Sequence, residues 1–135
     1  AQRPFILKGI MTARGAEKAL EAGASGIVVS NHGGRVLDHC PATAEVLPEI
    51  VDAVGGKLTI FVDGAIRSGM DMFKALALGA DAVLIGRPFV TTVYGGGEEG
   101  VQLYVQKLKA ELADTMRMCG AHSLAEIKRS MLFGF

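Results

Sequence analysis

One short segment, Ser30-Asn31-His32-Gly33-Gly34-Arg35, places an imidazole and a guanidinium within a single glycine-rich loop. A histidine side chain can accept a proton in the physiological pH range, as a general base of an enzyme must. The guanidinium of Arg35 presents a planar fork of N–H donors that matches a carboxylate. Together they predict a site that holds a small carboxylic acid and removes a proton from it. From the residues alone, a strand-capping His32 and a solvated Arg35 stay open as the alternative.

Two further glycine-containing segments carry arginine. Gly64-Ala65 is followed by Arg67, and Gly86 is followed directly by Arg87. Glycine lets backbone N–H groups approach an oxyanion closely, and arginine supplies positive charge and directed donors. The pattern predicts an anion site, for which the alternative is that both arginines are ordinary surface charges.

Two charged residues stand beside these segments. Asp63 immediately precedes Gly64 and would repel a phosphate, so we expect it to accept hydrogen bonds from hydroxyl groups such as those of a ribityl chain. Lys8 ends an apolar run, and its ammonium group is placed to stabilise negative charge that develops on a cofactor ring. A purely structural lysine is the alternative for Lys8.

Each segment follows a short aliphatic run, and each run is followed by a helical pattern. This alternation indicates βα units and a parallel sheet. In the last helix an apolar stripe includes Tyr104 and Leu108. The predicted strands are 5–8, 26–30, 58–62 and 82–86, and the predicted helices are 13–22, 43–54, 69–78 and 100–118.

The chain also repeats itself, since residues 18–30 align with residues 74–86. A repeated pair of βα units favours a barrel over an open doubly wound sheet, because a barrel is built by rotating one unit about an axis. A (β/α)8 barrel needs eight units, binds its ligands at the carboxyl ends of the strands and often holds phosphate at the last two loops. Residues 1–135 are therefore predicted to be one α/β domain, the C-terminal half (four βα units) of a (β/α)8 TIM barrel. Because open strand edges invite pairing, we expect it to pair with an N-terminal half-barrel.

Composition and charge exclude several classes of protein. Hydrophobic residues make up 50% of the chain and the net charge is zero, which argues against disorder and against nucleic-acid binding. No apolar run reaches the roughly 20 residues of a transmembrane helix, and no signal peptide is recognisable. The two cysteines are predicted to be free thiols in a reducing compartment, so the expected location is cytoplasmic. No metal site is predicted, because the cysteines and histidines lack ligand spacing.

Two segments towards the C-terminus carry weaker patterns. Residues 95–100 satisfy G-x-G-x-x-G, but they do not directly follow a strand, and Glu98 and Glu99 would repel a pyrophosphate. We expect a flexible lead into the last helix instead. Ser123 begins a capping-box pattern that predicts a final helix through Ile127.

Five blocks of the chain, taken in order, resemble the FMN-dependent 2-hydroxy acid oxidase and dehydrogenase family, which includes glycolate oxidase, lactate oxidase and flavin-linked lactate dehydrogenases. The resemblance covers essentially the whole chain, and the segment around His32 is its most specific part. The blocks are Lys8-Gly9-Ile10, residues 30–38, residues 63–69, residues 74–80 and Gly86-Arg87-Pro88.

The resemblance implies a role for each site residue. His32 resembles the catalytic base, and Arg35 resembles the arginine that binds the substrate carboxylate. Lys8 and Ser30 would contact the flavin. The ribityl chain and phosphate of FMN would be held by Asp63, Gly64, Ala65, Arg67, Gly86 and Arg87. The implied reaction is oxidation of a 2-hydroxy acid of the lactate or glycolate type to the 2-oxo acid.

The resemblance also implies that the first four βα units supply the acidic group that orients the histidine. We therefore expect the chain to be a fragment, produced by cleavage in an exposed loop or as a half-length product, and to be active only with its N-terminal half. The intact protein is expected to be a homo-oligomer. Two alternatives remain: another phosphate-binding flavin barrel such as an isomerase, and a non-catalytic half-barrel that binds a partner.

Overall fold

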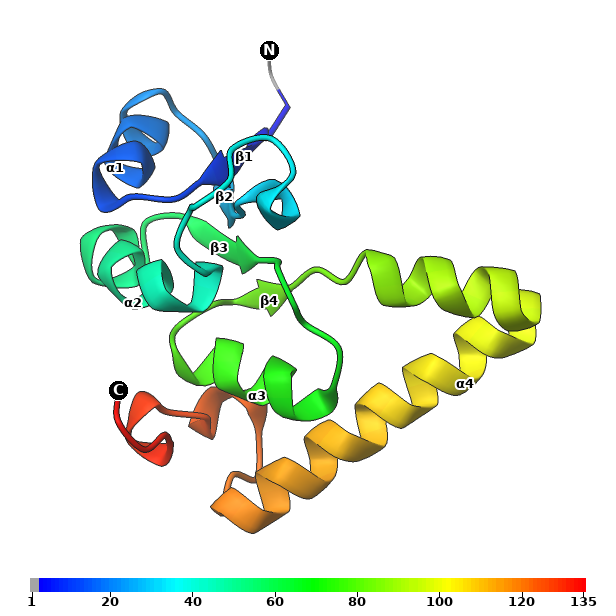
Figure 1. Ribbon diagram of the computed structural model, residues 1–135. Coiled ribbons are helices and arrows are strands. Elements are labelled where there is room, and N and C mark those ends of the chain that lie inside the picture. The colour runs from blue at the N-terminus through cyan, green and yellow to red at the C-terminus, as the bar shows by residue number, and fades with distance from the viewer. Residues whose placement is uncertain (1–2) are drawn as a thin grey trace.

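The computed structural model describes residues 3–135, which form a parallel four-stranded sheet with helices between the strands (Figure 1). Strands β1 (Ile6–Ile10), β2 (Gly26–Val29), β3 (Thr59–Val62) and β4 (Ala82–Val83) lie side by side in sequence order. They alternate with helices α1 (Ala13–Glu21), α2 (Thr43–Val54) and α3 (Gly69–Ala77). The predicted α/β fold of successive βα units is confirmed.

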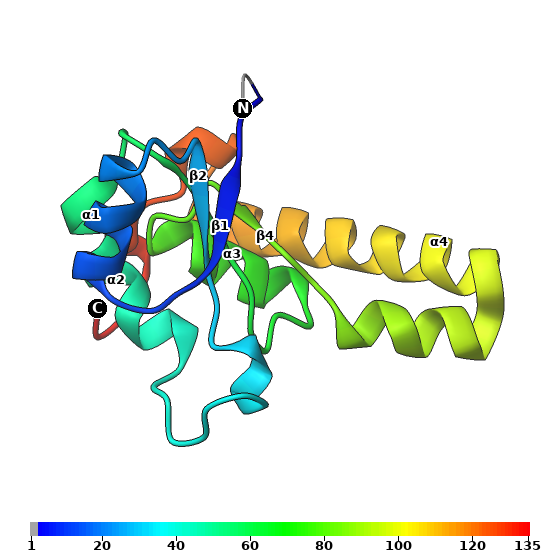
Figure 2. The same ribbon diagram turned by 90° about the horizontal axis from the view of Figure 1, so that it is seen from above.

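The core lies between the sheet and the helices α1 and α2, which Figure 2 shows on the same side of the strands. β2 is buried along its whole length, and its Ile27 pairs in register with Ile60 of β3. Both isoleucines are almost completely inaccessible to solvent, as are Leu47 and Ile50 from α2. The aliphatic runs therefore fold as a parallel sheet whose helix-facing side is buried.

The two outer strands remain open at their free edges. β1 is exposed over Ile6–Gly9, and the side chain of Ile6 is 51% accessible. β4 is only two residues long and pairs with Phe61 and Val62 alone, so the predicted strand 82–86 was too long. Beyond Val83 the ladder continues only through the N–H of Leu84, which donates to the carbonyl of Val62 at 2.9 Å.

A long helical hairpin, α4 (Arg87–Cys119), projects beyond the sheet in Figures 1 and 2. The predicted flexible lead at residues 95–100 was wrong, because these residues belong to the helices and form the tip of the hairpin. Gly97 has the non-helical angles φ 53° and ψ −137°, which reverse the chain between a first arm (residues 87–96) and a return arm (residues 98–119). A Cβ at Gly100 would lie 2.5 Å from the carbonyl oxygen of Thr92, so glycine is what lets the arms pack closely.

The end of the chain folds into two short 3₁₀ turns, η2 (Leu124–Glu126) and η3 (Arg129–Met131), instead of the predicted final helix. Glu126 accepts hydrogen bonds from the backbone N–H of His122 (3.0 Å) and from Ser123 Oγ (3.3 Å), but the Ser123 side chain caps no backbone N–H. Ile127 instead packs with Phe73 of α3 in a small second core. Over residues 3–135, no helix is long and apolar enough to cross a membrane.

Candidate active site

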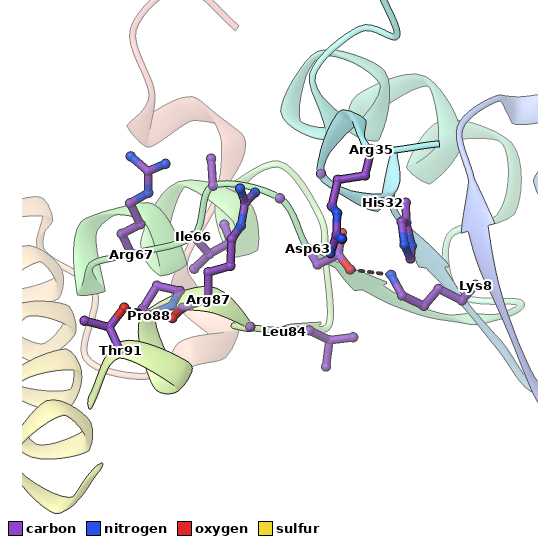
Figure 3. A pocket seen from close by; sticks show the side chains of 14 residues that line it. Lys8, His32, Arg35, Asp63, Ile66, Arg67, Leu84, Arg87, Pro88 and Thr91 are labelled. Carbon is purple, nitrogen blue, oxygen red and sulfur yellow. Dashed lines mark hydrogen bonds and ion pairs between the residues drawn. The ribbon is translucent and has the colours of Figure 1, made fainter. Parts of the chain in front are cut away.

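A pocket of about 450 Å³ opens at the carboxyl ends of the strands (Figure 3). This is the edge at which parallel barrels bind their ligands. Every residue predicted for the site lines the pocket except Ser30, which is buried. The lining residues are Lys8, His32, Gly33, Arg35, Asp63, Gly64, Ala65, Ile66, Arg67, Leu84, Gly86, Arg87, Pro88 and Thr91.

Apart from Ile66 and Leu84, the labelled side chains form two groups in Figure 3. The first group, which we call the histidine end, consists of Lys8, His32, Arg35 and Asp63. The second group, the double-arginine end, consists of Arg67, Arg87, Pro88 and Thr91. The two ends meet at Gly33, where a Cβ would lie 3.0 Å from Nη2 of Arg87.

Three polar residues from neighbouring strands are joined at the histidine end. Lys8 Nζ donates to Ser30 Oγ at 2.6 Å and to Asp63 Oδ2 at 2.5 Å, the contact drawn dashed in Figure 3. Lys8 belongs to β1, while Ser30 and Asp63 follow β2 and β3, so the parallel register brings them together. The Asp63 side chain is only 22% exposed, so its carboxylate holds the Lys8 ammonium in a site that is partly shielded from solvent.

The loop that carries His32 has an unusual backbone. His32, Gly33 and Gly34 have φ angles of 55°, 66° and 70°, which is three consecutive left-handed residues. For a histidine this conformation costs on the order of 1–3 kcal/mol. Two local hydrogen bonds offset that cost: Ser30 Oγ accepts from the N–H of His32 (3.2 Å), and Asn31 Oδ1 accepts from the N–H of Gly33 (3.0 Å). The imidazole therefore lies on a strained turn that the hydrogen bond to Ser30 stabilises.

A second strained turn follows β3. Gly64 has φ 98° and Ala65 has φ 59°. Thr43 Oγ1 donates to the carbonyl of Asp63 at 2.6 Å, and a Cβ at Gly64 would lie 2.8 Å from that same hydroxyl oxygen. Only glycine fits there without displacing Thr43. This turn directs the chain from the Asp63 carboxylate towards Arg67.

The charges around the pocket are unbalanced. Four cationic side chains and one carboxylate line it, and the carboxylate is already paired with Lys8. No ion pair is found for Arg35, Arg67 or Arg87 within residues 3–135. A Cβ at Gly86 would meet no atom within 4 Å, so the space beside that backbone is open. The pocket is thus suited to a ligand with more than one anionic group.

Two helices begin beside the pocket, and their first turns differ. The N–H groups that open α3 are used internally, since Asp71 closes a capping box with Ser68 and Glu111 Oε2 accepts from the N–H of Gly69 at 2.9 Å. Hydrogen bonds from Lys107 and then from Gly69 hold the pKa of Glu111 below its ordinary value. The first turn of α4 contains no acidic residue. Pro88 has no N–H and the N–H of Phe89 donates to the carbonyl of Gly86 at 3.0 Å, so within residues 3–135 this turn offers an external anion the backbone N–H of Arg87.

Four residues that line the pocket were not predicted from the sequence. Ile66, Leu84, Pro88 and Thr91 line the pocket, and each lies within four residues of a predicted site residue. Thr91 lies one helical turn after Arg87, and that spacing was the available signal. The contact between Lys8 and Asp63 joins residues far apart in sequence, and no local sequence pattern predicts it.

Comparison with known proteins identifies the relatives of the chain. The profile of a family described as FMN-dependent dehydrogenase matches residues 1–133. A peroxisomal (S)-2-hydroxy-acid oxidase of Oryza sativa subsp. japonica is 50% identical over 127 residues, which cover 94% of this chain and 35% of that protein. Glycolate oxidase of Spinacia oleracea is 49% identical, with 94% and 34% covered. A crystal structure of mandelate oxidase superposes with a TM-score of 0.92 at 46% identity, over 96% of this chain and 39% of that one.

The chain thus spans about a third of the length of the curated relatives it matches. The expected cytoplasmic location is contradicted, because this rice relative and two similar proteins of Arabidopsis thaliana are named as peroxisomal oxidases. Free cysteines argue only against an oxidising compartment, and import into an organelle is directed by short, receptor-recognised signals that overall composition does not reveal.

Proposed function

Because the chain belongs to the FMN-dependent dehydrogenase family, we propose that the protein containing it oxidises a small 2-hydroxy acid to the 2-oxo acid. The observation that carries the proposal is one pocket in which three guanidinium groups, none of them in an ion pair within residues 3–135, lie beside a histidine. Such a pocket accommodates two anions at once, namely the phosphate of FMN and the carboxylate of the substrate. The names of the relatives favour a substrate of the glycolate or lactate type.

The double-arginine end fits the phosphate of FMN. Arg67 and Arg87 supply charge, Gly86 leaves room for close backbone approach, and Arg87 would add the backbone N–H that opens α4. The ribityl hydroxyls would then pass the turn at Gly64 and Ala65 and donate to the Asp63 carboxylate. Lys8 and Ser30 would face the ring system from the floor of the histidine end.

The histidine end fits the substrate. The Arg35 guanidinium would bind the carboxylate through two parallel hydrogen bonds and so orient the hydroxyl-bearing carbon. Oxidation of the alcohol removes two protons and two electrons; the His32 imidazole would take one proton, and the other would leave with the electron pair. Bound FMN would supply the acceptor for the electron pair. The ammonium of Lys8, fixed by Asp63, would stabilise negative charge arising near it.

The rest of a barrel is needed to complete this site. Within residues 3–135, no carboxylate forms an ion pair with His32 and orients its ring. The free edges of β1 and β4 and the 35% coverage of the rice oxidase support the same view. We therefore propose that residues 1–135 form one part of a catalytic domain whose remaining βα units supply that partner.

A spectrum of the whole protein tests the proposal. We expect purified protein, or apoprotein reconstituted with FMN, to show flavin absorption that is bleached by glycolate or lactate without oxygen. Acetate, which has the carboxylate but no hydroxyl, should bind without bleaching and serves as the matched control. A protein that binds no added FMN would contradict the proposal and favour a non-catalytic module. A flavoprotein that no 2-hydroxy acid reduces would favour a different flavin barrel.

A further inference from the structure

The return arm of α4 contacts the loop that carries Arg67. Tyr104 lies on this arm, and its Oη donates to the backbone carbonyl of Arg67 at 2.8 Å. Its ring also packs edge-on against Phe89 of the first arm, with the ring centroids 5.1 Å apart and an interplanar angle of 75°. One side chain therefore touches both segments that supply arginines to the double-arginine end.

The contact completes the fixation of the Arg67 backbone. The N–H of Arg67 donates to Asp71 Oδ2 at 3.0 Å, and its carbonyl accepts from Tyr104. With both backbone groups held, only the side-chain torsions of Arg67 remain free. On the other side, Phe89 is two residues after Arg87 in the same helix, so the ring contact restrains the start of the first arm.

A second attachment lies two turns further along the return arm. Glu111 accepts from the N–H of Gly69, and a Cβ at Gly69 would lie 2.2 Å from the backbone nitrogen of Leu112. The helix and the loop therefore touch backbone to backbone at this point. Tyr104 and Glu111 are seven residues apart and share one face of the helix, so the return arm supports the loop as a rigid strut.

The chemistry of Tyr104 suits a permanent donor. Burial raises its pKa from the ordinary value near 10.0, so the phenol keeps its proton throughout the physiological range. The hydroxyl carries one proton and can direct it at the Arg67 carbonyl alone. Nothing in the proposed reaction requires Tyr104 to touch the substrate, and it does not line the pocket.

We propose that Tyr104 is a positioning residue that fixes Arg67 relative to Arg87 and thereby sets the preference of the site for a phosphorylated over an unphosphorylated flavin. The inference rests on the proposed FMN function. It assigns the phosphate geometry partly to the return arm of α4, which contributes no residue to the pocket lining. Because the restraint acts on one end of the ligand only, its loss affects the phosphate and leaves the ring system untouched.

Paired affinities of the whole apoprotein for FMN and riboflavin test the inference. Tyr104→Phe removes the hydroxyl and keeps the ring against Phe89. Since one hydrogen bond contributes about 0.5–1.5 kcal/mol, FMN should bind about three- to tenfold more weakly while riboflavin affinity is unchanged. Tyr94→Phe is the matched control, because Tyr94 lies on the same helix and is 90% exposed. It should alter neither affinity.

The outcomes separate the inference from the function. Wild-type protein that binds no FMN would overturn the proposed function. If wild type binds FMN but Tyr104→Phe leaves the ratio of FMN to riboflavin affinity unchanged, the positioning role is wrong and the function stands. Equal weakening of both ligands would likewise contradict the inference, since it indicates a general loss of structure. Should Tyr104→Phe fail to fold, Glu111→Gln, which weakens the second attachment, must lower the same ratio for the inference to survive.

Discussion

The two ends of the pocket are held in place by different means. At the histidine end the sheet itself does the positioning, since Lys8 on β1 donates to Ser30 and to Asp63, which follow the two neighbouring strands. At the double-arginine end the guanidinium groups have no ion-pair partner within residues 3–135, and the adjoining backbone is braced by the return arm of α4. At the histidine end Lys8 and Asp63 neutralise each other and Arg35 alone has no ion pair within residues 3–135, whereas at the double-arginine end neither guanidinium group is paired there.

This difference indicates which tasks the chain can perform with its own residues. Every group assigned to the phosphate belongs to β3, β4, α4 or their loops, and its supports are present too. The histidine end instead lies next to β1, an edge strand whose Phe5 and Ile6 are 43% and 51% exposed. We infer that anion binding resides largely in this part of the protein, while turnover depends on the units that pair with β1.

The largest effect is expected at the histidine end. In the whole protein, His32→Ala should lower kcat by about 10²–10⁴-fold, the usual contribution of a general base, while FMN stays bound. His39→Ala is a matched control, because His39 shares the left-handed backbone (φ 59°) but its side chain is 96% exposed. Steady-state turnover together with flavin content measures both effects. Turnover close to wild type would reject His32 as the base.

At the double-arginine end the pattern should be reversed. Arg87→Ala is expected to weaken FMN binding by about ten- to a hundredfold, because hydrogen bonds to a charged group contribute about 1.5–3 kcal/mol. At saturating FMN, kcat should remain close to wild type. Arg117→Ala, at the far end of α4, removes a guanidinium that pairs with Asp114 and should change neither quantity. A large fall in kcat at saturating FMN would show that the two ends are not separable.

The residues at both ends of the pocket were predictable from the sequence because recognisable local patterns mark the strand ends. Buried parallel strands are continuous aliphatic runs, and glycine beside a charged residue marks the loop that follows each one. Parallel strands in sequential order bring those loops to one edge, so listing the strand ends also identified the pocket. His32 and Arg67 were found in this way without knowledge of any contact.

The contacts that hold the site residues in position were not predictable, because they join residues that are distant in the sequence. Lys8 and Asp63 meet only when β1, β2 and β3 lie in register, and Tyr104 was interpreted merely as part of an apolar stripe. The glycines at residues 95–97 are typical of a flexible segment. Their actual role, reversing a helix at Gly97, depends on the packing of the return arm against the first arm.

The smallest effect is expected when an arginine at either end of the pocket is replaced by lysine, which keeps the charge but loses the planar fork of donors. The substrate carboxylate bound by Arg35 needs the two parallel donors of a guanidinium, whereas a phosphate also binds the point charge of lysine. Arg35→Lys should therefore raise KM for the 2-hydroxy acid about tenfold, the loss of about one charge-assisted hydrogen bond. Arg87→Lys should weaken FMN binding by less than that factor. Parallel measurement of KM and of the FMN dissociation constant decides the matter, and equal losses in the two variants would mean that both ends bind their anions in the same way.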